Sequence, residues 1–318
     1  MKPNLLTRIW PARQWMDREA TYCLRGVCIL IIVMGHASSS ATDPLMQTAA
    51  WQTFTDATHY WEWGTWATGV FFLLSGYGMT LSLDRLGRTT WAYAGRKLWK
   101  LLEAYLLLWV VYMACIVLLR RDLLTSSLLT DLLSLGMPQG VDAWFFKVIL
   151  ATYVLMLLLW AVPMNTRWRV VTMGVLAVAY YAVMRQAGAG PWWFNTILCQ
   201  PLGMWMALRR DWLSRRPWWT LAAAAVCLAG SLLTSAALFP PLTASLVAVL
   251  AVWLLPLHNR LLHFVGTGSL YFYLLEEPAY HCLVRPLSDS LPLYVVATWA
   301  ACALLTWGWL GVKAKKRG

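Results

Sequence analysis

The chain has 318 residues, of which 60% are hydrophobic and only 13% are charged, and its formal net charge is +12. Soluble globular domains are about half apolar and about a quarter charged. This composition therefore excludes an ordinary soluble enzyme and indicates a protein built to lie in lipid.

Ten apolar segments follow one another along the chain, each near the length of about 20 residues that a membrane-spanning helix needs. They lie near 24–41, 66–83, 101–119, 143–163, 168–184, 192–208, 217–238, 241–257, 262–284 and 291–312. We therefore expect an all-α, polytopic membrane protein with about ten transmembrane helices. Little of the chain is left for a second domain, so residues 1–318 are interpreted as a single transmembrane domain.

The positive charges predict the orientation of these helices. Most of the 26 Lys and Arg residues fall in alternate loops that share one side of the membrane with the N-terminus. Because cytoplasmic loops carry such an excess, both termini are predicted to be cytoplasmic, with an N-terminal segment at 1–23 and a basic tail at 313–318. The membrane surface accounts for the net positive charge, so the lipid bilayer is the expected partner and nucleic acid is not.

The first apolar segment, which contains "LRGVCILIIVMGHASSS" at 24–40, carries two ionisable residues at helical spacing. Arg25 and His36 are eleven residues apart, just over three helical turns, so both lie on one face and about 16 Å apart along the axis. An ionisable group in mid-membrane is costly and is usually kept for function. The alternatives are a neutral histidine bonded across a helix interface, an Arg25 that only belongs to the cytoplasmic charge set, and a signal peptide whose cleavage would remove His36.

The second apolar segment and the outer loop before it carry aromatic and small residues. Trp61 and Trp63, in "ATHYWEWGTW", fit the aromatic belt of a membrane interface, although they could instead stack on a sugar. Within "GVFFLLSGYGMTLS", Ser75 and Gly76 are small residues, which let helices approach closely. Close packing is therefore the simplest interpretation of that stretch.

The third segment is preceded by "GRKLWKLLEAY", in which three cations share one helix face. Arg96 and Lys100 are four residues apart, and Lys97 and Lys100 are three apart, so their side chains are neighbours. We call these three residues the cationic face. It is either more cytoplasmic positive charge or a seat for a phosphorylated cytoplasmic ligand.

Metal and redox chemistry have no support in the sequence. The seven cysteines lie in or beside apolar segments without a CxxC pair, so we interpret them as small packing residues rather than disulfides or metal ligands. No metal site is expected.

Taken together, these features resemble the acyltransferase-3 family of integral-membrane acyltransferases, which O-acylate surface glycans and related acceptors. The matching elements occur in family order: Arg25-x10-His36, "FFLLSGYG", "RKLWK", "AWFFKVI" at 143–149, "PLGMWMA" at 201–207 and "GTGSLYFYL" at 266–274. The expected number of helices agrees with the family as well.

The resemblance implies roles for these residues. Acyl-CoA, most simply acetyl-CoA, would bind from the cytoplasm with its phosphates near Arg25 and the cationic face, and His36 would take a proton from the acceptor hydroxyl. The acceptor would be an envelope glycan or a lipid-linked sugar at the outer side of a bacterial inner membrane. Motif residues with a packing role are Ser75, Gly76 and Tyr273, and the candidates on the acceptor side are Trp61, Trp63, Trp144 and Lys147.

Two acidic residues depart from the family pattern. Glu103 stands where members usually have a proline, and lysines replace expected arginines beside it. Glu276 stands where a histidine is common. We expect Glu276 to orient His36, to bind the acceptor, or to pair with Lys147 as a structural ion pair.

Two other functions remain open from the sequence. A transporter or flippase would use Arg25, His36 and Glu276 to line a polar pathway. Transporters often carry internal repeats, and no such symmetry is visible in this chain. A non-catalytic relative or membrane sensor would tolerate the loss of His36.

Overall fold

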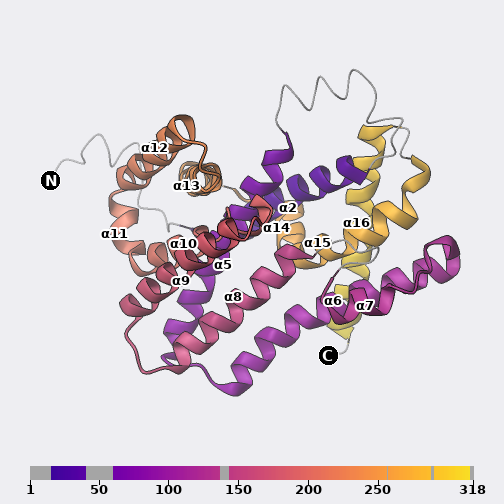
Figure 1. Ribbon diagram of the computed structural model, residues 1–318, viewed down its shortest axis with the longest axis horizontal. Coiled ribbons are helices and arrows are strands. Elements are labelled where there is room, and N and C mark those ends of the chain that lie inside the picture. The colour runs from indigo at the N-terminus through magenta and orange to yellow at the C-terminus, as the bar shows by residue number, and fades with distance from the viewer. Residues whose placement is uncertain (1–15, 41–59, 137–142, 256, 288–289, 316–318) are drawn as a thin grey trace. The chain divides into compact units, whose positions relative to one another are not determined.

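The computed structural model describes residues 16–40, 60–136, 143–255, 257–287 and 290–315. All regular structure in these residues is helical and no strand occurs among them, which confirms the all-α class (Figure 1). The α-helices are α2 (Arg18–Ser40), α5 (Tyr60–Leu86), α6 (Trp91–Leu119), α7 (Leu128–Leu133), α8 (Trp144–Ala161), α9 (Thr166–Gln186), α10 (Cys199–Leu208), α11 (Arg210–Arg215), α12 (Trp218–Leu233), α13 (Phe239–Leu254), α14 (Arg260–Thr267), α15 (Ser269–Pro278) and α16 (Leu291–Lys315).

Five helices among the described residues are long and apolar enough to cross a membrane. Their spans are Arg18–His36, Trp63–Leu86, Trp91–Leu119, Trp144–Ala161 and Pro292–Lys315. The apolar helices identify the chain as a multi-pass membrane protein. The predicted count of about ten is not confirmed, because several of the other segments fold as shorter or interrupted helices, and α12 and α13 have only 16 residues each.

Prolines explain two of the interrupted segments. The segment expected at 192–208 is α-helical only from Cys199, which puts Pro201 in the first turn of α10, where a missing N–H is tolerated. In the segment expected at 262–284, α15 ends at Pro278 and continues as a π-helical turn, η4 (Ala279–Leu283). A proline inside a helix removes a hydrogen bond and its ring clashes with the carbonyl four residues earlier. Such π-turns occur often at functional sites.

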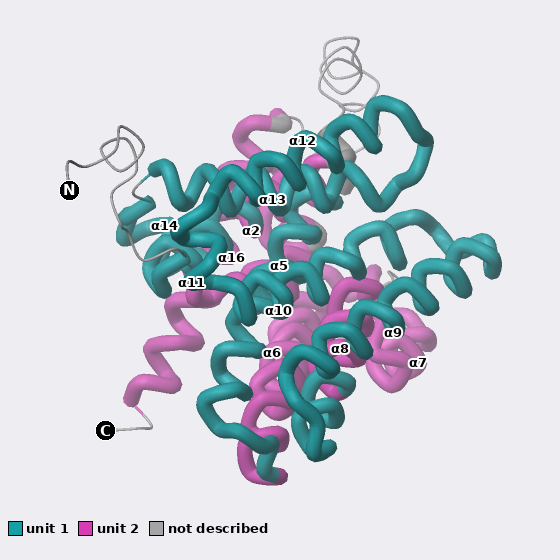
Figure 2. Tube along the Cα trace, turned by 90° about the vertical axis from the view of Figure 1, so that its left-hand side faces the viewer, with its two compact units in different colours: residues 1–28, 65–90, 155–266 teal, residues 29–64, 91–154, 267–318 magenta. Residues whose placement is uncertain are grey.

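The helices form two compact units, and neither is continuous in sequence (Figure 2). Unit 1 contains residues 1–28, 65–90 and 155–266, and unit 2 contains residues 29–64, 91–154 and 267–318. The first part of α2, with Arg25, belongs to unit 1. The end of α2, with His36, belongs to unit 2, as do α6, α15 and α16.

In unit 1, α5 and α10 cross at two glycines. A Cβ atom at Gly76 would overlap the backbone carbonyl of Gln200, and one at Gly203 would overlap the carbonyl of Leu73. A side chain at either position would therefore separate the two helices. The small residues of the second apolar segment thus lie where backbones meet.

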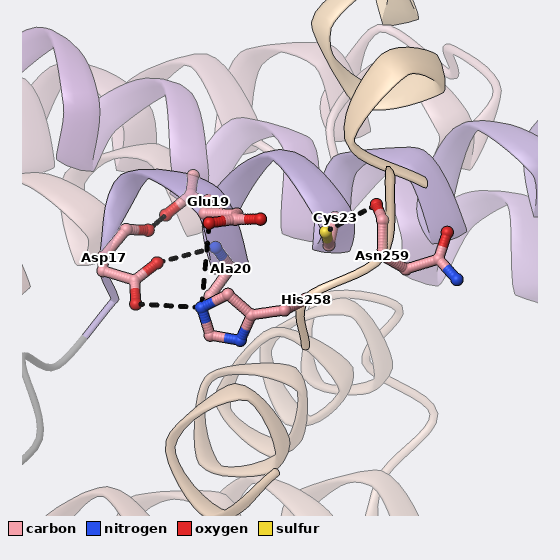
Figure 3. A network of polar contacts seen from close by, with 7 residues as sticks. Asp17, Glu19, Ala20, Cys23, His258 and Asn259 are labelled. Carbon is pink, nitrogen blue, oxygen red and sulfur yellow. Dashed lines mark hydrogen bonds and ion pairs between the residues drawn. The ribbon is translucent and has the colours of Figure 1, made fainter. Parts of the chain in front are cut away.

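Polar contacts join the start of α2 to the loop before α14, also within unit 1 (Figure 3). The Cys23 thiol donates to the backbone carbonyl of Asn259 at 3.4 Å. His258 Nε2 lies 3.8 Å from Glu19 Oε2 and 4.0 Å from Asp17 Oδ2. These contacts fix the turn of α2 that comes just before Arg25.

In unit 2, α15 contacts both α6 and α16. The centre of the unit is aromatic, with Tyr105, Phe146 and Phe272 fully buried. Beyond α15, the Tyr294 hydroxyl donates to the backbone carbonyl of Tyr280 at 3.0 Å and so ties α16 to η4. The end of α15, which carries Glu276 and Glu277, therefore continues into a turn that α16 also contacts.

Candidate active site

Two ionisable side chains 240 residues apart in sequence meet inside unit 2. His36 Nδ1 lies 2.6 Å from Glu276 Oε1. The Glu276 side chain is 1% exposed, whereas that of His36 is 40% exposed. The carboxylate is therefore enclosed by protein, while the imidazole keeps a surface that another molecule can reach.

This hydrogen bond determines which imidazole nitrogen carries the lone pair. In a neutral ring, the Nδ1–H donates to Glu276, so the basic lone pair is on Nε2. A carboxylate in this position also stabilises the imidazolium that forms when Nε2 takes a proton. The arrangement fits a general base whose tautomer is fixed by a buried partner.

The two oxygens of Glu276 have different surroundings. Within the described parts of the chain, Glu276 Oε2 is buried and has no hydrogen-bond partner. Of the roles expected for Glu276, orienting His36 is the one that the geometry supports, since the carboxylate lies at bonding distance from the imidazole.

Aromatic rings from α15 and α8 extend from His36. The Tyr273 ring centroid is 6.1 Å from that of His36 and 5.0 Å from that of Phe145. Phe145 in turn meets Trp144 edge to face at 6.0 Å. We call Tyr273, Phe145 and Trp144 the aromatic wall. Lys147 lies one turn after Trp144 on α8 and is half-buried.

Sequence reasoning did not single out Phe145 and left the role of Glu277 undefined. Phe145 lies within the "AWFFKVI" motif, and its neighbour Trp144 was the available signal. Glu277 is as deeply buried as Glu276, at 1% exposure. Two adjacent buried carboxylates are costly, which is a reason to look for a function at this end of α15.

Arg25 lies in unit 1 against α5. Its guanidinium carbon is 5.8 Å from the Tyr22 ring centroid. A Cβ atom at Gly78 would lie 4.0 Å from one of its terminal nitrogens, so the glycine leaves room for the guanidinium. Its Nε is buried without a hydrogen-bond partner among the described residues. That Arg25 binds an anion stays a prediction.

The cationic face lies in the first turns of α6, in unit 2. Arg96 and Lys100 are exposed, and the Lys97 ammonium is 5.3 Å from the Tyr93 ring centroid. Arg25 and the cationic face belong to different units. A shared anion site for them therefore stays a prediction.

The remaining predicted residues are distributed over both units. Ser75 and Gly76 are buried in α5 of unit 1, and Tyr273 is buried in α15 of unit 2. Trp63 is half-buried in α5, and the side chain of Trp61 lies outside what the structure describes. A role of Trp61 and Trp63 in binding an acceptor stays a prediction.

Glu103, which departs from the family pattern, has a defined partner. Lys313 Nζ lies 2.6 Å from Glu103 Oε1 and donates to the Tyr271 hydroxyl at 3.2 Å. This cluster, which we call the Lys313 clamp, joins α6, α15 and α16 within unit 2. Lys313, the first residue of the basic tail predicted at 313–318, is helical and paired. Residues 316–318 lie outside the described residues, and the cytoplasmic position of the tail stays a prediction.

Among the described residues, no group of three or more His, Cys, Asp or Glu side chains could hold a metal ion. All seven cysteines are free, and six of them are buried.

A family model described as an acyltransferase domain, that of the acyltransferase-3 family, matches residues 14–311. No curated protein and no solved structure matches the chain.

Proposed function

The chain belongs to the acyltransferase-3 family, and we propose that it is a membrane-embedded O-acyltransferase. In this proposal it moves an acyl group, most simply acetyl, from cytoplasmic acyl-CoA to a hydroxyl of an envelope glycan or lipid-linked sugar on the outer side of a bacterial inner membrane. The observation that carries the proposal is the hydrogen bond between His36 and the buried Glu276.

The proposed reaction uses His36 as general base and then as general acid. Nε2 takes the proton from the acceptor hydroxyl while the hydroxyl oxygen attacks the thioester carbonyl carbon. The tetrahedral intermediate collapses, the C–S bond breaks, and the imidazolium returns the proton to the departing CoA thiolate. Glu276 keeps Nδ1–H in place and stabilises the positive ring between the two steps.

We assign the binding of acyl-CoA to Arg25 and to the cationic face. Arg25 has a buried Nε without a partner among the described residues, and a guanidinium binds phosphate through two parallel hydrogen bonds. The cationic face adds charge near the predicted cytoplasmic surface. Lysine is a point charge without that fork geometry, so Arg25 is expected to contribute more to donor affinity than Lys97 or Lys100.

Acceptor binding is assigned to the aromatic wall and to residues near it. Trp144 lies at the start of α8 and is only partly buried, and its ring faces are suited to the apolar side of a sugar. Lys147 could donate a hydrogen bond to a sugar oxygen. Trp61 and Trp63 complete the proposed acceptor side.

Purified protein in proteoliposomes tests the proposal directly. Radiolabelled acetyl-CoA is supplied on one side and an envelope lipid extract from the host on the other. We expect label to enter the extract with wild-type protein and not with His36→Ala. If the label crosses the membrane still attached to CoA, or if an acceptor crosses without gaining an ester, the transporter interpretation replaces the proposal.

A further inference from the structure

The link between α10 and α12 is rich in arginine. Arg209, Arg210, Arg215 and Arg216 are all exposed, and one acidic residue, Asp211, lies among them. Asp211 Oδ1 pairs with Arg210 Nε at 3.4 Å. The other three arginines are not balanced by an acidic residue within this link, which lies wholly in unit 1.

Three indoles form a stack beside these arginines. Trp219 lies between the other two, with its ring centroid 4.2 Å from Trp218 and 5.8 Å from Trp212, and the interplanar angles are 27° and 28°. The guanidinium of Arg216 lies 5.8 Å from the Trp212 centroid. These ring contacts hold the indoles together, and Leu213, the residue after Trp212 in α11, is 1% exposed.

The indoles are nevertheless open at the surface, since Trp218 is 51% and Trp219 is 44% exposed. Large exposed aromatic groups beside cations are typical of a membrane interface, where the ring meets acyl chains and the polar edge meets headgroups. Trp218 and Trp219 begin α12, and Leu221 and Val226 farther along the same helix are exposed as well. Lipid is therefore the natural neighbour of this stack.

We propose that Trp212, Trp218 and Trp219, together with Arg215 and Arg216, form a binding site for the headgroup of an anionic phospholipid. Charge complementarity supports this occupant: clustered Arg and Lys residues beside a membrane helix attract anionic lipids, and a guanidinium matches the geometry of a phosphodiester. The indole stack holds Arg216 in place and covers the upper part of the lipid chains. The proposal does not depend on the acyl-transfer reaction.

Native mass spectrometry of the full chain tests this site. The protein in neutral detergent is titrated with phosphatidylglycerol or with phosphatidylcholine, and the dissociation constant of the first bound lipid is measured. We expect a preference for phosphatidylglycerol in wild-type protein. The double variant R215Q/R216Q should weaken that binding by about fivefold per arginine, or roughly 25-fold in total.

A matched control separates a built site from general attraction by positive charge. Arg85, in the last turn of α5, and Arg88, which follows that helix, form another exposed pair. In the described part of the chain, neither guanidinium lies over an aromatic ring. R85Q/R88Q removes the same charge and should change the binding of phosphatidylglycerol little. Trp219→Ala keeps every arginine but breaks the stack, and it should weaken binding to a degree close to that of R215Q/R216Q.

Three results would overturn the proposal. The first is an equal loss in both arginine pairs, which would mean that only net charge matters. The second is unchanged binding in Trp219→Ala while its melting temperature in detergent matches wild type. The third is displacement of phosphatidylglycerol by adenosine 3′,5′-bisphosphate, which would make the cluster a site for a soluble phosphate ligand.

Discussion

Glu276→Gln is the substitution that addresses the chemistry of the site most narrowly. Glutamine keeps the size of the side chain and an oxygen that can accept from His36 Nδ1–H, so the ring stays in place. What it removes is the negative charge 2.6 Å from the imidazole, which matters only when the ring becomes positive. The variant should therefore lower kcat and leave the KM for acyl-CoA nearly unchanged.

The size of the effect follows from the kind of bond that is weakened. A hydrogen bond to a charged group contributes about 1.5–3 kcal/mol, and tenfold in rate corresponds to about 1.36 kcal/mol. The expected loss in kcat is therefore about 10- to 150-fold. The assay is the initial rate of CoA release in the presence of acceptor, measured over a range of acyl-CoA concentrations.

Glu277→Gln is the matched control, because Glu277 is the next residue and is equally buried but is not the hydrogen-bond partner of Nδ1. We expect a clearly smaller loss of kcat for it. The reasoning would be refuted if both variants lost activity equally, if Glu276→Gln raised KM alone, or if it kept full activity at wild-type abundance.

Three further predictions concern stability and donor binding. Lys313→Met should destabilise unit 2 by about 1–3 kcal/mol, because the Lys313 and Glu103 side chains are only 22% and 19% exposed and such a pair lies between surface and buried ion pairs in strength. The melting temperature in detergent measures this loss. The double variant Glu103→Lys with Lys313→Glu, which exchanges the two charges, should melt close to the wild-type temperature. Gly203→Leu should abolish stable accumulation, because its side chain meets the α5 backbone, whereas Gly174→Ala, where a Cβ atom has open space, should accumulate normally, as a blot of membrane fractions would show. Arg25→Ala should raise the KM for acyl-CoA more than the KM for the acceptor, as two-substrate kinetics would show.

Each of these has a contrary result. Failure of the exchanged pair to restore the melting temperature would mean that the Lys313 clamp is not held by its charges. Normal accumulation of Gly203→Leu would contradict the close crossing of α5 and α10. An effect of Arg25→Ala on the acceptor alone would place the donor phosphates elsewhere.

The sequence predicts well what depends on local spacing. Arg25 and His36 do lie in one helix, α2, because an eleven-residue separation within an apolar run fixes their relation. The break at Pro278 is predictable in the same way, since a proline inside an expected helix predicts an interruption. The apolar run from 262 to 284 hides that break, because its hydrophobicity continues past the proline.

Contacts between distant segments could not be predicted in this way. Glu276 had three possible partners or roles in the sequence, and only packing of α15 places its carboxylate against His36. Lys313 looked like one more cation of a tail, and nothing local to it indicates Glu103, which is 210 residues away. Such pairs arise from how helices pack, which the spacing of residues along the chain does not determine.

The central claim is that His36 catalyses acyl transfer to an envelope acceptor. Mass spectrometry of envelope glycans and lipids from host cells tests it most directly, in cells that express wild-type protein, His36→Ala or neither, at matched abundance. We expect an ester mass shift with wild-type protein alone, and that shift would also identify the acyl group and the acceptor. The same ester in cells with His36→Ala would contradict it.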